Sequence, residues 1–214
     1  MTGPTESSDT SLERFAARVA HDLNNLLTGI LGNLELLQLR ATRNRLPGLD
    51  SYFEGANGAG SRAVAFAGRL MLYSGRGGIP PVPVPVDEVL ARFTARARCS
   101  LAAGDASVLC DPAQLELAIT ELLANAAAAG GQVSIASAVA GEDAIVTISD
   151  TGRGMSAETL ACAGEPFFTT HANGTGRGLG LSIVARVVRD IGGTLHIESA
   201  EGAGCTVTLR LARA

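Results

Sequence analysis

A histidine, a carboxylate and an amide lie close together near the start of the chain, at His21, Asp22 and Asn25. A neutral histidine has one ring nitrogen free to attack while the other donates a hydrogen bond, so it can be a nucleophile near neutral pH. A carboxylate within hydrogen-bond reach can orient such a ring and accept its proton. The three residues are therefore a candidate acceptor site for a transferred group.

Two glycine-containing stretches in the second half could bind a phosphorylated ligand. Asp150 ends an apolar segment and is followed by Gly152 and Gly154. Its carboxylate can accept a hydrogen bond from an exocyclic amine, and glycines let the backbone approach a flat ring. The stretch 174–181 runs straight into an apolar helix, whose free N–H groups suit phosphates. Each pattern alone also fits an ordinary turn or a flexible loop.

A pair of polar residues, Glu121 and Asn125, lies on a predicted helix. The helix starts at Asp111-Pro112, a good cap followed by a proline at the first helical position, and ends at Ala129. Residues four apart share one helix face, and carboxylate and amide oxygens are ligands that suit Mg²⁺. An exposed polar face is the alternative interpretation of this pair.

Two stretches near the N-terminus have the spacing of long helices that pack in a bundle. Apolar residues recur in each at alternating steps of four and three. They are Ala16, Ala20, Leu23, Leu27, Ile30, Leu34 and Leu37, widened by Phe15, Val19 and Leu26, and then Tyr52, Ala56, Ala59, Ala63, Phe66, Leu70 and Tyr73. His21 lies off this seam, toward solvent. Two copies forming a four-helix bundle would bury both seams, and a hairpin docked on its own second domain is the alternative.

A change of composition divides the chain into parts. They are a disordered N-terminus at 1–11, a helical hairpin at 12–75, a Pro/Gly linker at 76–86 and a mixed α and β domain at 87–214. The last part is predicted to hold helices at 87–98, 111–129 and 179–190, a short strand pair within 99–110, and strands at 132–139, 144–149, 194–199 and 205–211. This arrangement indicates an α+β fold class, with an α/β sandwich whose helices cover one face of a mixed sheet.

The composition argues against several classes of function. The net charge of −4 gives no basic surface for nucleic acid. All seventeen positive charges are arginines, which excludes Schiff-base chemistry and a Walker loop. The four cysteines are widely spaced and are predicted to be reduced. No signal peptide or membrane span is expected, so a cytoplasmic protein is predicted.

In their order, these stretches resemble the transmitter core of a sensor histidine kinase. This is a phosphoacceptor hairpin followed by an ATP-binding domain of the gyrase, Hsp90, histidine kinase and MutL type. Residues 21–28 are similar to the H-D-x-N-N-L-L form of the phosphoacceptor motif. Further similar stretches are the N-box at 121–126, the first glycine box at 150–155, the F-box at 165–170, the second glycine box at 174–181 and a closing strand turn at 202–206.

The resemblance implies a protein histidine kinase that phosphorylates His21 from Mg-ATP and passes the phosphoryl group to an aspartate of a response-regulator receiver. In that mechanism Asp22 orients the ring and takes its proton, and Asn25 positions water in the reverse, phosphatase reaction. Mg²⁺ would be held by Asn125 with Glu121 nearby. The implied ATP contacts are Glu121, Asn125, Asp150, Gly152, Gly154, Phe167, Thr175, Gly176, Arg177, Gly178, Leu179, Gly180 and Thr206.

Two positions depart from the usual pattern of this family. Ala128 stands where a charged residue is common, and His171 stands where the lid commonly has a lysine. With the absence of lysine, they leave open a histidine phosphotransferase with a weak or non-functional ATP site, and a non-enzymatic dimeric adaptor. The expected partners are a second copy of the chain, a response-regulator receiver and a separate sensory or input protein.

Overall fold

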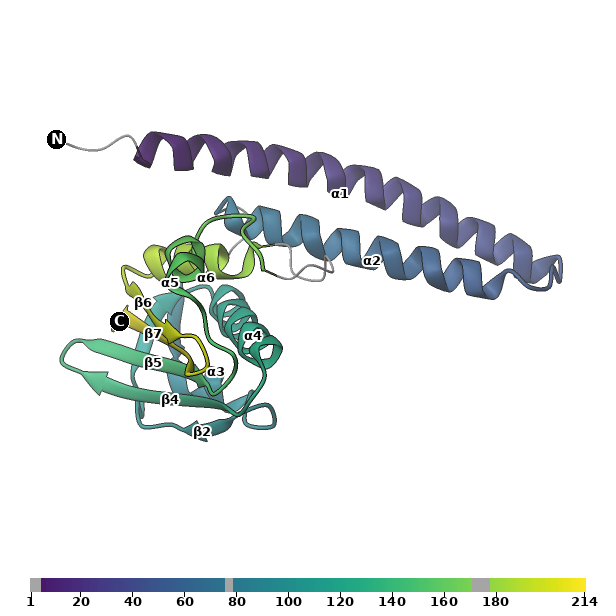
Figure 1. The fold of residues 1–214 in the computed structure, drawn as a ribbon. Helices are drawn as coiled ribbons and strands as arrows, with labels where there is room; N and C mark the ends of the chain where they lie inside the picture. Colours follow the sequence, from purple (N-terminus) through teal and green to yellow (C-terminus); the bar gives the residue numbers. More distant parts are fainter. Residues whose placement is uncertain (1–4, 76–78, 171–177) are drawn as a thin grey trace. The chain divides into compact units, whose positions relative to one another are not determined.

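The computed structural model describes residues 5–75, 79–170 and 178–214, with side chains from residue 11 onward. The chain divides into two compact units, Met1–Gly77 and Gly78–Ala214. The first is a helical hairpin and the second an α/β sandwich (Figure 1). This sequence of a hairpin and a sheet-based domain confirms the predicted fold class.

Two long helices, α1 (Thr5–Arg43) and α2 (Asp50–Tyr73), form the hairpin. The turn between them uses left-handed backbone at Arg45 and Gly48, a conformation that costs glycine nothing. Helix α1 begins within the stretch 1–11 that was predicted to be disordered. Extending an existing helix is cheap compared with starting one, which explains why this helix continues past the last apolar contact.

Small side chains bring α1 and α2 close together. The buried residues are Ala16, Ala17, Ala20, Leu27 and Ala41 of α1, and Ala67, Leu70 and Tyr73 of α2. A Cβ at Gly60 would overlap the side chain of Leu31, so the glycine here permits the close approach. The hairpin is thus held by van der Waals contact along one face of each helix.

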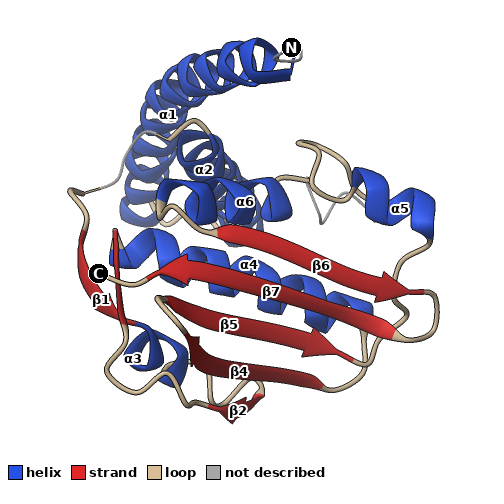
Figure 2. Cartoon of the chain, turned by 90° about the vertical axis from the view of Figure 1, so that its left-hand side faces the viewer, coloured by secondary structure: helices blue, strands red, loops and turns tan. Residues whose placement is uncertain are grey.

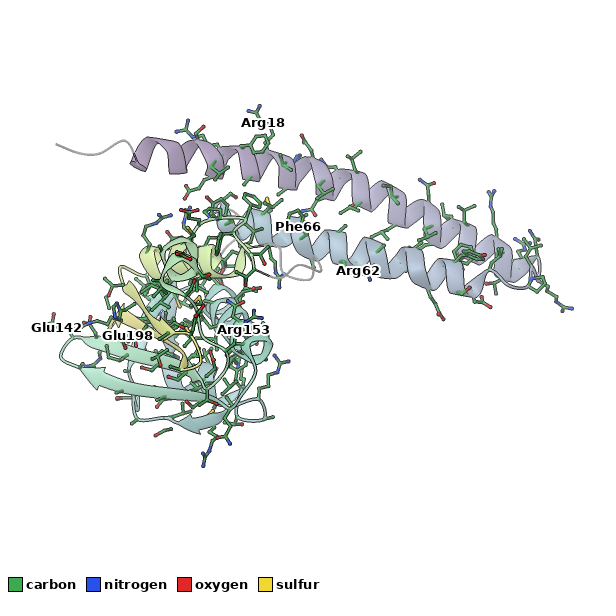
Figure 3. All side chains as sticks on the ribbon, viewed as in Figure 1. Arg18, Arg62, Phe66, Glu142, Arg153 and Glu198 are labelled. Atoms are coloured by element: carbon green, nitrogen blue, oxygen red, sulfur yellow. The ribbon has the colours of Figure 1, made fainter. Side chains whose placement is uncertain are left out.

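Helix α1 also carries an apolar face that α2 does not cover. This outer stripe consists of Phe15, Val19, Leu26, Ile30 and Leu37, at alternating steps of four and seven. Ile30 and Leu37 of the predicted seam are exposed in the single chain, as expected if two helices cannot bury both seams alone, because the apolar arc of α1 is wider than a single partner helix can bury. On other faces, Arg18 and Arg62 project from α1 and α2 into solvent (Figure 3).

A five-stranded mixed sheet in the order β2-β4-β5-β7-β6 forms the base of the second unit. The strands are β2 (Arg98–Ser100), β4 (Val133–Ala140), β5 (Asp143–Asp150), β6 (Thr194–Ala200) and β7 (Gly204–Ala212). Strand β2 is parallel to β4, and the other pairs are antiparallel. Ala144, Val146 and Ile148 of β5 alternate into the core.

Helices α4 (Pro112–Ala129) and α6 (Gly180–Asp190) cover one face of this sheet (Figure 2). Both helices lie where the sequence predicts them. Ile183, Val184 and Val187 of α6 are buried at the spacing of one helix face. A short helix, α5 (Ala157–Cys162), was not predicted, although its cap Ser156 accepts a hydrogen bond from Thr159 N–H. No helix in the described ranges is long and apolar enough to cross a bilayer.

Helix α3 (Val86–Ala91) is shorter than the predicted helix at 87–98. The N–H groups of Arg92, Phe93 and Arg96 bond to carbonyls three residues back, a pattern of tight turns rather than of an α-helix. Arg92 and Arg96 would also place like charges one turn apart in a continued helix. The local charges therefore favour the early end.

Two short strands lie close to the predicted stretch 99–110, but the prediction that they pair with each other was wrong. Strand β3 (Ser107–Cys110) pairs instead with β1 (Val82–Pro85), which lies in the predicted linker, and β2 pairs with β4. The loop between β2 and β3 is held away from a hairpin because Ser137 Oγ accepts hydrogen bonds from the N–H groups of Ala102 and Ala103. Prolines are tolerated in β1 because it is an edge strand.

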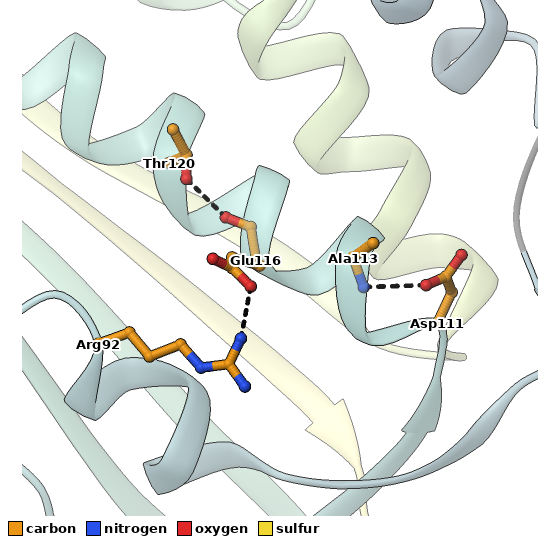
Figure 4. Close-up of polar contacts among 5 residues, drawn as sticks. All are labelled: Arg92, Asp111, Ala113, Glu116 and Thr120. Carbon is orange, nitrogen blue, oxygen red and sulfur yellow. Dashed lines mark hydrogen bonds and ion pairs between the residues drawn. The ribbon is translucent and has the colours of Figure 1, made fainter.

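Asp111 joins the start of α4 to the segment that leads into β1. Its Oδ1 accepts a hydrogen bond from Ala113 N–H at 2.9 Å, as the predicted cap requires, and its Oδ2 accepts one from Ile79 N–H at 3.0 Å. The Asp111–Ala113 contact is drawn in Figure 4, with the surface ion pair of Arg92 and Glu116 further along the helix. One buried carboxylate thus serves two backbone donors.

We predict that Asp111→Ala weakens α4 and the attached segment by about 1–3 kcal/mol, because a helix cap and a second buried hydrogen bond are lost together. Asp111→Asn is the matched control, since asparagine is an equally good cap. Hydrogen exchange of the full chain, read at the backbone N–H groups of Ala113 and the later residues of α4, measures the effect. Equal protection in the alanine and asparagine variants would contradict the assignment.

Candidate functional site

His21 lies on the solvent side of α1, with both predicted neighbours in contact. The Asp22 Oδ1 atom is 3.3 Å from His21 Nδ1, and the Asn25 Nδ2 atom is 3.4 Å from the same nitrogen. The helix makes these contacts possible because residues one and four positions along lie near the same face. The structure therefore brings His21, Asp22 and Asn25 together as the sequence predicts.

Both contacts use Nδ1 and leave the other ring nitrogen accessible. Within the described part of the chain, Nε2 makes no hydrogen bond or ion pair. The side chain of His21 is 70% exposed, so a large substrate can reach it. The arrangement suits a ring that is oriented through one nitrogen and reacts through the other.

Asp150 is a buried carboxylate at the end of β5 that retains one free acceptor. Its Oδ1 accepts a hydrogen bond from Gly152 N–H at 2.8 Å, and only 8% of the residue is exposed. Among the described residues no donor to Oδ2 is found. A buried acceptor of this kind is suited to a ligand that brings its own N–H group.

Cys205, rather than Thr206, is the residue of β7 that lies beside Asp150. The two residues are cross-strand partners, and burial together with the Asp150 charge raises the pKa of the Cys205 thiol. Thr206 points to the opposite face of the sheet, where its Oγ1 is 3.0 Å from Ser149 Oγ. The structure therefore does not bring Thr206 to Asp150, and the sequence analysis missed Cys205. Alternation along β7 was the available signal, and it identifies Cys205 only once the register with β5 is known.

Backbone-to-backbone contacts around Gly152 and Gly154 hold the segment after β5. A Cβ at Gly152 would overlap the carbonyl of Ala129 at the end of α4, and one at Gly154 would overlap the carbonyl of Ala200. The N–H of Arg153 donates to the Ala129 carbonyl at 3.1 Å, and its own carbonyl accepts from the β6–β7 turn at 2.7 Å. Only glycine fits both close approaches.

Glu121 and Asn125 of α4 lie beside the N-terminus of α6. A Cβ at Gly180 would come within 2.8 Å of Glu121 Oε2 and 3.7 Å of Asn125 Nδ2. Glu121 is buried, whereas Asn125 is exposed. A carboxylate, an amide and the positive end of a helix dipole therefore converge, and this set suits a cation together with an anionic ligand.

Phe167 and Gly178 tie the F-box to the second glycine box. Phe167 has a left-handed backbone, with φ 68°, and its N–H donates to the Gly178 carbonyl at 2.7 Å. Such a conformation in a non-glycine residue costs about 1–3 kcal/mol and often accompanies a functional site. The side chain of Leu179 belongs to the core. The predicted contacts Thr175, Gly176 and Arg177 lie outside the described residues, as does His171.

Two protein families match the chain, one over each part. Residues 11–74 match the His Kinase A (phospho-acceptor) domain. Residues 110–214 match the domain described as histidine kinase-, DNA gyrase B- and HSP90-like ATPase. The first range contains His21, and the second contains the Glu121–Asn125 pair, Asp150 and Gly180.

The chain is also similar to proteins named as sensor kinases. The chain is 29% identical to the sensor kinase CckA of Brucella abortus over 94% of its own length and 24% of that protein. It is 35% identical to the sensor histidine kinase ZraS of Escherichia coli K12 over 58% of its own length and 26% of that protein. The chain thus spans about a quarter of the length of these relatives.

Solved structures share the fold. Full-length ShkA, crystallised with AMPPNP, has a TM-score of 0.75 at 23% identity, covering 94% of this chain and 46% of that one. The mycobacterial sensor histidine kinase MprB has a TM-score of 0.52 at 27% identity, covering 63% of this chain and 98% of that one. At 23% identity, the likeness to ShkA is a likeness of fold.

We predict that Gly154→Ala destabilises the second unit by about 3 kcal/mol or more, because a left-handed backbone and a carbonyl overlap both oppose the new methyl group. Gly141→Ala is the matched control. Gly141 has nearly the same φ, 64° against 65°, but no atom lies within 4 Å of the position that a Cβ would take there. It should lose only about 1 kcal/mol. Urea unfolding followed by circular dichroism measures both, and equal losses would contradict the contact.

Proposed function

The chain belongs to the histidine kinases through its phospho-acceptor and ATPase domains, and we propose that it phosphorylates His21 from ATP and passes the phosphoryl group to a response-regulator aspartate. The observation that carries this proposal is the exposed His21 ring, with Nδ1 in contact and Nε2 open. In-line attack needs such a nucleophile, and the protein then contributes mainly positioning and charge compensation.

Asp22 serves as the proton acceptor of the transfer step. Nε2 offers its electron pair to the γ-phosphorus, and the ring becomes positively charged unless its Nδ1 proton leaves. The Asp22 carboxylate, 3.3 Å from Nδ1, is within reach of that proton. Both side chains are largely exposed to solvent, which keeps this contact weak before reaction.

The second unit supplies the nucleotide site. The Oδ2 atom of Asp150 would accept a hydrogen bond from the exocyclic amine of adenine, and Cys205 lies beside Asp150 as its cross-strand partner. The backbone of Gly178–Gly180 and the start of α6 offer N–H groups and a positive dipole end to the phosphates. The expected contacts of Thr175, Gly176 and Arg177 belong to this proposal as sequence predictions.

Mg²⁺ fits the pair on α4. Asn125 would hold the ion through its amide oxygen, with Glu121 nearby and phosphate oxygens completing the ligands. The bound ion would neutralise charge that develops on the phosphates. The exposed amide of Asn125 and the buried carboxylate of Glu121 are the oxygen ligands that this face of α4 would offer to the ion.

A second copy of the chain is the proposed partner of the hairpin. The outer stripe of α1 repeats at heptad-like spacing, and Tyr52, Ala56 and Ala59 leave α2 with exposed apolar positions as well. Two hairpins joined through these faces make a four-helix bundle that buries all of them. A response-regulator receiver and a separate input protein are the other proposed partners.

We predict that incubation with γ-labelled ATP and Mg²⁺ yields an acid-labile label on the wild-type chain and none on His21→Ala. Asp150→Asn should lower labelling at least about tenfold, because a hydrogen bond to a charged acceptor is lost. His196→Ala is the matched control, since His196 is also exposed and lies 3.5 Å from a carboxylate, Glu198. It should label as the wild type does.

The same assay separates the alternatives. A phosphotransferase would take no label from ATP but would take it from a phosphorylated receiver. A non-enzymatic adaptor would take label from neither. Either result overturns the kinase proposal.

We predict that Leu26→Ser with Ile30→Ser raises the dissociation constant of the dimer about a hundredfold or more, since two apolar side chains per copy leave the interface. Leu39→Ser with Leu36→Ser is the control. These residues are equally exposed, at 67% and 59% against 65% and 60%, but lie off the stripe. Sedimentation equilibrium measures the constant, and equal weakening by both pairs would contradict the proposed interface.

A further inference from the structure

Two side chains of α1 contact the same nitrogen of His21, and the two contacts require opposite protonation states of that nitrogen. The Asp22 carboxylate only accepts hydrogen bonds, so its contact at 3.3 Å needs a proton on Nδ1. The amide nitrogen of Asn25 only donates, so its contact at 3.4 Å needs a lone pair on Nδ1. A neutral imidazole carries one N–H group, and one nitrogen cannot meet both demands at once.

The outcome of this competition decides whether Nε2 is a nucleophile. When Nδ1 donates to Asp22, the lone pair of the neutral ring is on Nε2, which faces solvent. When Asn25 donates to Nδ1, the proton is on Nε2, which then has no lone pair to offer. The two neighbours of His21 therefore stabilise a reactive and an unreactive tautomer of the same ring.

We propose that Asn25 is a positioning residue that restrains phosphorylation of His21 by holding its ring in the unreactive tautomer, in competition with Asp22. The proposal rests on the proposed function and assigns a regulation to its acceptor site. In the reactive tautomer, Nε2 gives its electron pair to the γ-phosphorus of ATP. The bond from the γ-phosphorus to the bridging oxygen breaks, and ADP leaves with the electron pair of that bond. The Nδ1 proton passes to Asp22.

The exposure of the group keeps both contacts weak. The side chains of His21 and Asp22 are 70% and 68% exposed, and exposed contacts of this kind are individually weak. Both tautomers are then populated, and the ratio responds to the loss of either neighbour. All three residues lie within about one turn of α1, so the competition is a local property of this helix.

Nitrogen NMR of the full chain measures the tautomer ratio directly. All variants for this experiment also carry His171→Gln and His196→Gln. Of the three histidines in the chain, only His21 then remains. With ¹⁵N-labelled histidine at about pH 9, where imidazoles are neutral, the shifts of the two ring nitrogens give the fractions of the Nδ1–H and Nε2–H forms. No nucleotide is needed.

Asn25→Ala should raise the ratio of Nδ1–H to Nε2–H about two- to fivefold, the effect of one weak hydrogen bond. Asn25→Asp should raise it further, because a second carboxylate can only accept. Asp22→Asn should lower it. The matched control is Asn33→Ala, which removes an exposed amide of α1 that donates to the Gly29 carbonyl and should leave the ratio unchanged.

An unchanged or lower ratio in Asn25→Ala would overturn the proposal, because the amide would then be idle or would accept from Nδ1 through its oxygen. A kinetic readout accompanies the spectrum. The initial rate of labelling from ATP should rise in Asn25→Ala by a similar factor and stay unchanged in Asn33→Ala. A wild-type chain that takes no label would overturn the proposed function, while the NMR ratio still decides the role of Asn25.

Discussion

The close approach of backbone to backbone after Asp150 is the constraint on which the second unit depends. Gly152 touches the end of α4, and Gly154 touches the β6–β7 turn, at distances that no side chain allows. These contacts position Asp150 against β7 on one side and bring α4 to a defined place on the other. Helix α4 carries Glu121, which in turn meets the start of α6. A ligand site is thus assembled by tightly packed glycines rather than by long side chains.

In the hairpin, a single helix, α1, has three faces with different roles. One face of α1 is packed on α2 through alanines, a second is the outer stripe, and a third presents His21 to solvent. The alanine face is narrow, so it keeps the two helices close together. The rest of the circumference of α1 is left for the outer stripe and for the face that carries His21. A reactive residue on such a helix gains a rigid support without being buried, which a large phosphorylated substrate requires.

Local patterns predicted the elements well and their long-range partners poorly. The cap at Asp111, the positions of α4 and α6, and the His21 neighbours all followed from spacing within a few residues. The pairing of β1 with β3 did not, because strand partners distant in sequence leave no local signature. Cys205 was missed for a similar reason. Its place beside Asp150 depends on how β7 pairs with β5. A shift of this pairing by one residue would move its side chain to the other face of the sheet.

The proposed acceptor site and the proposed nucleotide site are therefore built from contacts of different range. The neighbours of His21 come from its own helical turn, so its choice of tautomer needs no contact from the ATPase unit. The proposed nucleotide site instead joins α4, β5, β7 and α6, whose residues are far apart in sequence. A change at the donor can alter how often a γ-phosphoryl group is available. In the proposed mechanism the reactivity of the ring is set separately, by the carboxylate of Asp22 and the amide of Asn25 on α1.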